Sequence, residues 1–303
     1  MEEMRCNSNL LSKFAHSKKT EEEMKRNTIF SAVMALCMGL SFTSCLDSGN
    51  DSYNPEIRCF AKTGSYMGLN FFKSADGKTT IYPTTASMSN LEKDGFSMSK
   101  VNAAYIIGTY DASINNNLDS SVDAVQEYKD VNVAAVSLDA KVEIAEPGAE
   151  NDSVNHQLIR AIDLSKRTSQ TSPLLKPWFF YDKTTLVLPI SYSFQEYKKH
   201  AFTLVYAPSS TKADDNTINL RLCHYNGNEK STQYDSFDYS GYPNLFFFAF
   251  DLNEVYSEWR NITHSTYPET ITITYWASDR ELDPAGVEPE EYVVDCKAIS
   301  NTL

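Results

Sequence analysis

The stretch Tyr66-Met-Gly-Leu-Asn-Phe-Phe-Lys-Ser-Ala-Asp-Gly-Lys-Thr-Thr-Ile-Tyr-Pro83 reads as a strand, a turn and a second strand. Aromatic and β-branched residues fill both arms, and such residues favour pleated, half-buried positions. Asp76-Gly77 separates the arms and is a strong hairpin signal, because glycine accepts a positive φ at a tight turn. No helical apolar period flanks the stretch, so it predicts a β-sheet domain.

Strand signals continue on both sides of this hairpin. Ile57–Lys62 alternates ahead of it, Val101–Tyr110 is a long apolar strand candidate behind it, and 131–136 and 141–145 complete the set. The polar stretch 84–99 reads as one long middle connection. Five or six strands in about 90 residues predict a small OB-like Greek-key barrel over residues 56–146.

Residues 147–155 contain Pro147-Gly148 and no apolar pattern, so we expect them to form a linker. Strand signals then recur over residues 156–303, which predicts a second, larger domain with a β-sandwich fold. The strand candidates are 156–164, 178–181, 185–193, 201–207, 217–225, 245–252, 270–276 and 292–298. One short helix is expected at Asp251–Trp259, where apolar residues recur with helical spacing. The chain is therefore predicted to be all-β.

The first 44 residues read as a leader with a lipoprotein signal peptide. Met24, a plausible true start, opens a basic segment, and the mostly apolar run 29–39 is too short to span a membrane. Small residues then precede Cys45, as in a bacterial lipobox, so we expect lipid on Cys45. Residues 45–55 would form a flexible tether to the membrane. The alternatives are an ordinary secretory signal or a short membrane anchor.

The chain carries 27 Lys and Arg against 40 Asp and Glu, a formal charge of −13. The leader holds six of these basic and five of these acidic residues, so the acidity belongs to the exported body. An acidic body lacks the basic face that phosphates require, so we expect no nucleic-acid partner. The expected location is the cell envelope, as an outer membrane lipoprotein, with the periplasmic or surface face left open.

Catalytic and metal-binding motifs do not stand out in the sequence. His200 and His224 lie at neighbouring strand ends, and a metal site with Asp214 or Asp215 is an alternative to two histidines that solvate a turn. We therefore expect no metal, no cofactor and no catalytic residue; a hydrolase remains a remote alternative. The cysteines Cys59, Cys223 and Cys296 allow at most one disulfide, and buried thiols are the simpler interpretation.

Aromatic residues crowd the second domain. We expect 178–180 and 246–248 to be core of the sandwich, whereas the segment 234–242 reads as an aromatic, acidic loop. Aromatic rings beside carboxylates suit a protein hot spot or a sugar face. The candidate binding residues are Tyr234, Phe237, Tyr239 and Tyr242.

The layout resembles the NigD-like lipoproteins of Bacteroidota. The resemblance rests on Cys45 with its acidic tail, on Asp76-Gly77 followed by 80–83, and on the strand texture of 200–206, 218–227, 248–252 and 271–275. It implies an OB-like domain and a β-sandwich behind a lipoprotein signal, with no catalytic residues to assign. It further implies a non-enzymatic binding role, including a bacteriocin-immunity role by association. Glycan binding through the aromatic loop is the alternative.

Overall fold

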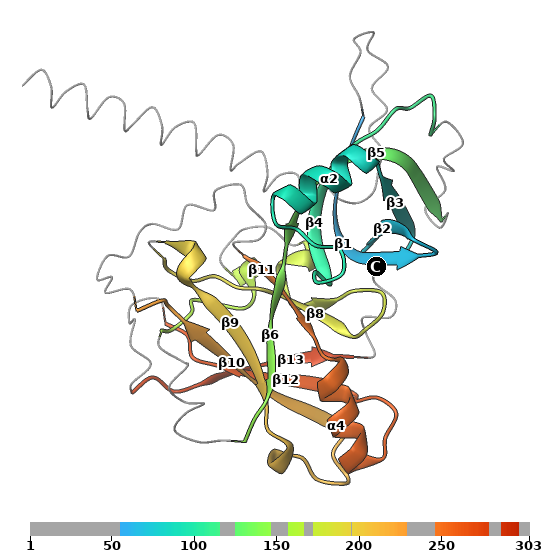
Figure 1. Ribbon diagram of the computed structural model, residues 1–303. Helices are drawn as coiled ribbons and strands as arrows, with labels where there is room; N and C mark the ends of the chain where they lie inside the picture. Colours follow the sequence, from blue (N-terminus) through green and yellow to red (C-terminus); the bar gives the residue numbers. More distant parts are fainter. Residues whose placement is uncertain are drawn as a thin grey trace, which may run out of the picture.

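The computed structural model describes residues 55–115, 125–146, 157–166, 172–194, 196–228, 246–278 and 286–296. It consists of a small β-barrel beside a larger β-sheet (Figure 1). The predicted all-β class is confirmed. The leader, nearly all of the tether and the expected linker 147–155 lie outside the described residues.

The barrel is closed, with strand order β1-β2-β3-β5-β4, the order of an OB-fold. Its strands are β1 (Glu56–Tyr66), β2 (Leu69–Ser74), β3 (Thr79–Pro83), β4 (Ala103–Thr109) and β5 (Gln126–Ser137). Strand β1 pairs antiparallel with β4, and β3 pairs parallel with β5, which closes the sheet on itself. The OB-like barrel predicted from the sequence is confirmed.

The two hairpins of the barrel differ in how well the sequence predicts them. The turn at Asp76-Gly77 forms as expected, with Gly77 at φ 74° and its N–H bonded to the Ser74 carbonyl at 2.8 Å. The strand expected to start at Tyr66, however, starts only at Leu69, as β2. Tyr66 ends β1, and the turn falls at Met67 and Gly68, with φ 49° and 80°. Two positive φ values in a two-residue turn usually call for Asn-Gly, so methionine conceals the signal.

A helix, α2 (Thr85–Lys93), occupies part of the polar connection where the sequence predicted no regular element. Thr84 caps it, since its Oγ1 accepts the Ser87 N–H at 3.1 Å. The Ser87 hydroxyl in turn accepts the Val133 N–H of β5 at 2.9 Å, and Leu91 is buried. Because α2 buries so few apolar side chains, its sequence shows no helical apolar period.

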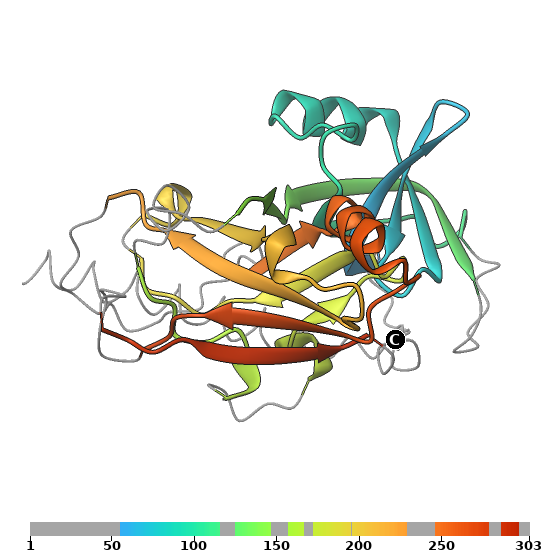
Figure 2. The ribbon, with the colours of Figure 1, turned by 90° about the horizontal axis from the view of Figure 1, so that it is seen from below.

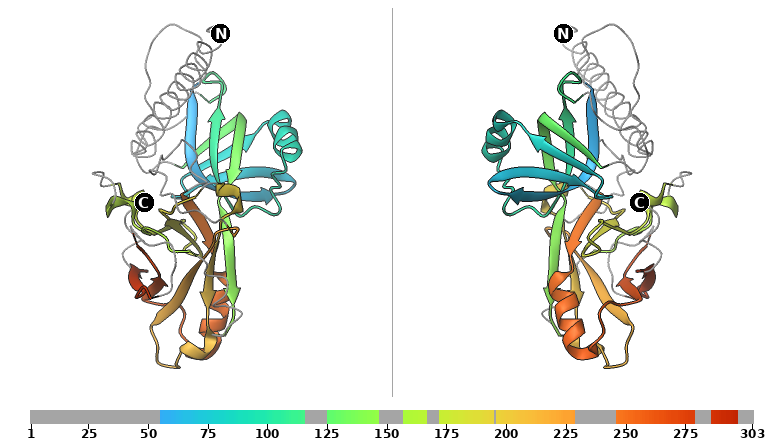
Figure 3. Two further views of the ribbon diagram at one scale, coloured as in Figure 1. Left: turned by 90° about the vertical axis from the view of Figure 1, so that its left-hand side faces the viewer. Right: turned by 90° about the vertical axis from the view of Figure 1, so that its right-hand side faces the viewer.

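The second unit is an eight-stranded mixed sheet with order β13-β12-β10-β9-β6-β11-β8-β7. Its strands are β6 (Asp139–Ile144), β7 (Trp178–Phe179), β8 (Thr185–Pro189), β9 (Ala201–Tyr206), β10 (Thr217–Tyr225), β11 (Phe247–Asp251), β12 (Thr270–Tyr275) and β13 (Glu290–Asp295). Leu186 and Leu188 of β8 share one core with Ile271 and Ile273 of β12. The two halves of the sheet therefore enclose a common core, as in a β-sandwich (Figure 3).

Helix α4 (Asn253–Thr263) packs on this core, and its predicted apolar face is confirmed. Leu252, Val255, Tyr256 and Trp259 are all buried, at the spacing i, i+3, i+4, i+7. His264 ends the helix in the left-handed conformation. The other helices within the described ranges are single 3₁₀ turns: η1 (Leu164–Lys166), η2 (Pro173–Leu175), η3 (Tyr197–Lys199) and η4 (Pro208–Ser210).

Two strand predictions need correction. The described part of 156–164 makes only single bridges, from Ile159 to Ala277 and from Ala161 to Ser191, so it is not a strand. The strand expected at 141–145 does form, as β6, but it pairs with β9 and β11 in the larger sheet and not in the barrel. Its Ala140 and Val142 pack against the sandwich core. That burial is a tertiary contact, which strand periodicity does not encode.

Strand β6 follows β5 after a single residue, the buried Leu138. Figure 1 shows this chain segment leaving the barrel and continuing through the middle of the larger sheet. The two units are thus joined by an almost unbroken extended segment, hydrogen-bonded to neighbours in both sheets. Such a connection restricts movement of one unit relative to the other far more than a polar linker does.

A second hydrophobic core lies between the barrel and the sheet. Phe60 of β1 is at its centre, with ring centroids 5.2 Å from Tyr105, 5.4 Å from Trp178 and 4.9 Å from Phe247. The prediction that 178–180 and 246–248 are core is confirmed for every residue except Phe248, which is half-buried. Most of these rings, however, bury against the barrel, and not inside the sandwich.

No disulfide joins Cys59, Cys223 and Cys296 to one another. Burial, and the Asp76 carboxylate less strongly, raise the pKa of Cys59 to about 12. Burial likewise raises the pKa of Cys296 to about 11. Since the thiolate is the reactive form, both are weak nucleophiles and fit the interpretation as packed hydrophobic residues.

Among the residues that the structure describes, no helix is both long and apolar enough to cross a membrane.

Candidate functional site

The sequence-predicted site residues are not all in view. Cys45 and the loop residues Tyr234, Phe237, Tyr239 and Tyr242 lie outside the described part of the chain. The described residues that flank the loop segment are Asn228, after β10, and Phe246, before β11. The end of β10 and the start of β11 are therefore the described regions on either side of the predicted binding residues.

His200 and His224 meet at this end of the sheet, as the sequence suggested. His200 Nδ1 lies 2.8 Å from His224 Nε2, within hydrogen-bonding distance. The strand register explains the contact: Phe202 of β9 lies opposite His224 of β10, and His200 is two residues before Phe202 on the same face. Diagonal neighbours on one face of an antiparallel pair approach closely enough for long side chains to touch.

Aromatic rings surround the two histidines. Phe202 stacks on His224 with centroids 4.5 Å apart, and Tyr192 meets the His224 ring edge to face at 5.4 Å. We call the whole set the His–aromatic cluster; its members are Tyr192, Phe194, His200, Phe202, His224 and Phe248. His224 is buried, whereas His200 is partly exposed at the surface. The cluster thus leads from the sandwich core to solvent.

Two exposed tyrosines lie near the cluster: the Tyr197 ring is 6.3 Å from the ring of Phe194, and Tyr225 directly follows His224 in β10. Tyr197 of η3 and Tyr225 at the end of β10 are 38% and 36% exposed. The Lys198 ammonium lies 5.9 Å from the Tyr197 ring, within cation–π range. Gly227 packs directly on Lys199, since a Cβ at 227 would lie 2.5 Å from the Lys199 Cβ. The η3 turn and the end of β10 therefore form one continuous surface.

Replacement of His200 by alanine is expected to lower the free energy of unfolding by about 1–3 kcal/mol, because it removes a hydrogen bond to the buried His224 ring. Urea denaturation of the parent and the variant measures the change. Lys198→Ala, an exposed neighbour, is the control and is expected to change stability by less than about 0.5 kcal/mol. Equal effects of the two substitutions would contradict a structural role for the histidine pair.

The alternative of a metal site is not supported in this arrangement. Asp214 and Asp215 lie between η4 and β10, at the far end of β9 from His200, and the six residues of β9 span about 20 Å. No group of three or more His, Cys, Asp or Glu suited to a metal occurs in the described ranges. A hydrogen-bonded histidine pair among aromatic rings presents apolar surface with a few polar atoms. Such a surface suits the binding of a ligand better than the coordination of a metal.

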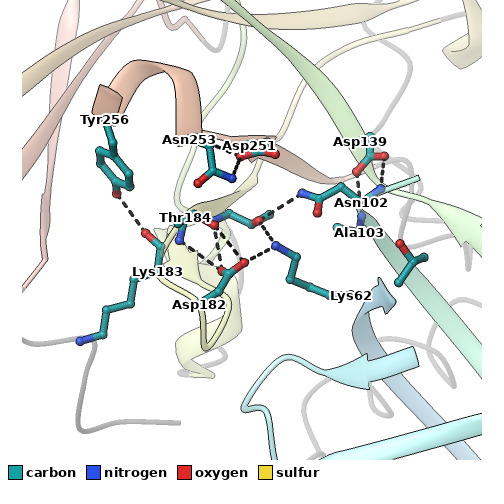
Figure 4. A network of polar contacts seen from close by, with 12 residues as sticks. Lys62, Asn102, Ala103, Asp139, Asp182, Lys183, Thr184, Asp251, Asn253 and Tyr256 are labelled. Atoms are coloured by element: carbon teal, nitrogen blue, oxygen red, sulfur yellow. Dashed lines mark hydrogen bonds and ion pairs between the residues drawn. The ribbon is translucent and has the colours of Figure 1, made fainter. Parts of the chain in front are cut away.

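A polar network at the junction of the two units was not foreseen from the sequence (Figure 4). Lys62 of β1 makes an ion pair with Asp182 and donates to the Thr185 hydroxyl at 2.9 Å. Asn102 donates to the same hydroxyl at 3.2 Å. These residues come from both units and from positions up to 123 apart in the chain, so no local motif links them.

Asp139, the first residue of β6, completes the junction. Its carboxylate accepts the backbone N–H groups of Asn102 at 2.7 Å and Ala103 at 2.9 Å, at the start of β4. Burial raises the pKa of Asp139, the two N–H donors offset part of that rise, and the Asp251 carboxylate adds to it. The junction therefore holds a partly buried carboxylate in place by hydrogen bonds.

Comparisons with known proteins identify the fold. No protein-family model matches the chain, and no curated protein matches it. Among solved structures, a putative lipoprotein from Bacteroides fragilis is 18% identical with a TM-score of 0.58, and the match covers 80% of this chain and 98% of that one. This similarity shows that the two proteins share a fold, barrel and sheet together.

Two further solved structures from related bacteria are similar over a comparable length. An uncharacterised protein from Parabacteroides merdae is 12% identical, with a TM-score of 0.44 over 79% of this chain and 99% of that one. A NigD-like immunity protein from Bacteroides caccae is 13% identical, with a TM-score of 0.43 over 81% of this chain and 100% of that one.

Proposed function

We propose that this chain is a lipid-anchored protein of the bacterial cell envelope that binds a partner and catalyses no reaction. The anchor is the predicted lipid on Cys45, and the outer membrane is the proposed location. The observation that carries the binding role is the pair of exposed tyrosines, Tyr197 and Tyr225, close to the His–aromatic cluster and to the start of the segment 229–245. Fold similarity to a putative lipoprotein supports the proposal.

The anchor is tested by Cys45→Ala in cells that process lipoproteins. The thioether requires the Cys45 thiol, so we expect the variant to lose labelling by a radioactive or clickable fatty acid and to leave the membrane fraction. Cys296→Ala, which removes a partly exposed thiol of the folded body, is the control and should keep label and location. Acyl labelling that survives Cys45→Ala would contradict the assignment.

The binding surface is tested by site-specific photo-crosslinking in intact envelopes. A photoreactive residue at Tyr239 should capture a defined envelope protein, and Tyr242→Ala should abolish the capture. The control places the photoreactive residue at Tyr267, an exposed tyrosine between α4 and β12. Capture of the same protein from both positions, or of none, would contradict the proposed surface.

A glycan is the second candidate ligand, because aromatic rings beside carboxylates also suit sugar faces. An array of purified bacterial and host glycans tests it with the exported body of the protein. Binding of one glycan class that is lost in Tyr239→Ala would favour this candidate over a protein partner. The NigD-like resemblance makes a bacteriocin the class of protein partner to test first. If the protein confers immunity, deletion of the gene should sensitise the cell to that bacteriocin.

A further inference from the structure

The end of the β1–β2 hairpin exposes three large apolar side chains that lie together. Tyr66 is 66% exposed, Met67 85% and Leu69 63%. Tyr66 and Leu69 are cross-strand partners, and Met67 occupies the turn between them. Figure 2 shows the end of this hairpin projecting from the barrel. Soluble proteins rarely expose several large apolar side chains side by side without a partner surface.

The apolar surface continues from the turn along the outside of the barrel. The Phe71 ring packs against Gly64, where a Cβ would come within 2.4 Å of the ring. The Phe71 and Tyr82 rings have centroids 6.2 Å apart. Turn chemistry does not account for the exposed methionine, since a positive φ in such a turn favours asparagine or glycine.

The hairpin end also lacks charge. The ten residues 63–72 include no Asp, Glu, Lys or Arg, in a chain whose formal charge is −13. Threonine, serine and asparagine are its only polar residues. Protein interfaces use charged and polar groups to set orientation and exclude wrong partners. An uncharged apolar projection instead suits a fluid apolar phase, which imposes no fixed orientation.

We propose that the end of the β1–β2 hairpin inserts into the surface of the lipid bilayer that holds Cys45. Met67 and Leu69 would enter the acyl region and Tyr66 would lie at the headgroup level, where tyrosine is favoured. The proposal rests on the proposed lipid anchor. The chain from Cys45 to Pro55 spans up to about 35 Å when extended, which lets β1 lie beside the same leaflet.

The lipid on Cys45 makes membrane insertion by only three side chains effective. Three side chains alone give weak, reversible adsorption, as a single short acyl chain does. Attachment through Cys45 turns the second contact into an intramolecular one, at an effective concentration of about a millimolar or more. With no cation in the hairpin end, the contact needs no anionic lipid and is insensitive to salt.

The test uses residues 46–303, which contain every described residue, with an N-terminal hexahistidine that binds nickel-chelating lipid in phosphatidylcholine vesicles. This tether replaces the Cys45 lipid, so the result is independent of whether Cys45 is modified. An environment-sensitive dye on Ser65→Cys, in a Cys296→Ser background, reports bilayer contact through quenching by brominated lipid. The same dye on Glu92→Cys, exposed on α2, is the control.

We expect brominated lipid to quench the dye at position 65 and to leave the dye at position 92 unaffected. The triple variant Tyr66→Thr, Met67→Asn, Leu69→Thr should abolish the quenching and lower the vesicle partitioning of untethered protein roughly 30-fold or more. Asparagine suits the turn and threonine suits the strands, so the variant should keep its unfolding temperature.

Several outcomes would overturn the inference. One is equal quenching at positions 65 and 92, and another is quenching that persists in the triple variant. Loss of quenching in 0.5 M salt would show electrostatic adsorption. Protection of the dye at position 65 by a purified protein or glycan, without quenching by lipid, would assign the hairpin end to that ligand. The acyl-labelling experiment with Cys45→Ala tests the lipid anchor separately from the hairpin.

Discussion

Phe60→Ala is expected to lower the free energy of unfolding by about 3–5 kcal/mol, the usual cost of emptying a buried phenylalanine site. Phe60 is buried, and its ring contacts Tyr105 of the barrel together with Trp178 and Phe247 of the larger sheet. The cavity would therefore open between the two units. Because the lost contacts couple the barrel to the sheet, the variant should also unfold less cooperatively.

Calorimetry of the variant tests both consequences. The parent is expected to unfold in one transition, and Phe60→Ala in two overlapping transitions, with a calorimetric enthalpy larger than the van't Hoff enthalpy. Phe72→Ala is the matched control, since Phe72 is fully buried in the core of the barrel itself. Phe72→Ala should destabilise the barrel without separating the units because it leaves the junction intact. A single transition in both variants would contradict the coupling role of Phe60.

Lys62→Met is expected to destabilise the protein by about 2–4 kcal/mol. The side chains of the Lys62–Asp182 pair are only 12% and 22% exposed, so the substitution leaves a poorly solvated carboxylate without its cation. The loss is smaller than for a fully buried pair, because Asp182 keeps some solvent contact and still accepts the Thr184 hydroxyl. Denaturant unfolding of the variant measures the change.

Two companion substitutions sharpen this result. Lys141→Met removes the cation of an exposed ion pair with Glu143 and is expected to change stability by less than about 1 kcal/mol. Adding Asp182→Asn to Lys62→Met removes the isolated carboxylate, so the double variant should recover part of the lost stability. A double variant less stable than Lys62→Met would show that the asparagine disrupts the junction in another way.

Within the described part of the chain, local signals predicted most of the strands and the helix α4, but not the helix α2. Asp76-Gly77 predicted the β2–β3 hairpin because glycine tolerates the positive φ that the turn requires. The helical spacing of four apolar residues predicted α4, because all four side chains face the core: Leu252, Val255, Tyr256 and Trp259. The turn at Met67-Gly68 and helix α2 were missed, since one lacks the usual turn residue and the other buries few apolar side chains.

The candidate site, too, was predicted only in part from the sequence. Strand-end positions indicated that His200 and His224 would meet, because neighbouring strands bring their ends together. Their enclosure by Tyr192, Phe202 and Phe248 was not foreseen, since that depends on how β8, β9, β10 and β11 assemble. The exposure of the β1–β2 hairpin end was not predicted either. Tyr66 and Leu69 look like ordinary strand residues in the sequence, and only the structure shows that nothing in the described residues covers their side chains.

Short-range periodicity, turn chemistry and composition were enough to predict the all-β class, the barrel hairpin and a lipid-anchored leader. The place of β6 in the larger sheet, and the joining of the two units by Phe60 and Lys62, became evident only from the three-dimensional contacts. Those features depend on contacts between residues more than sixty positions apart in the chain. Alternation along a strand specifies which side chains share a face, but not which surface will cover that face.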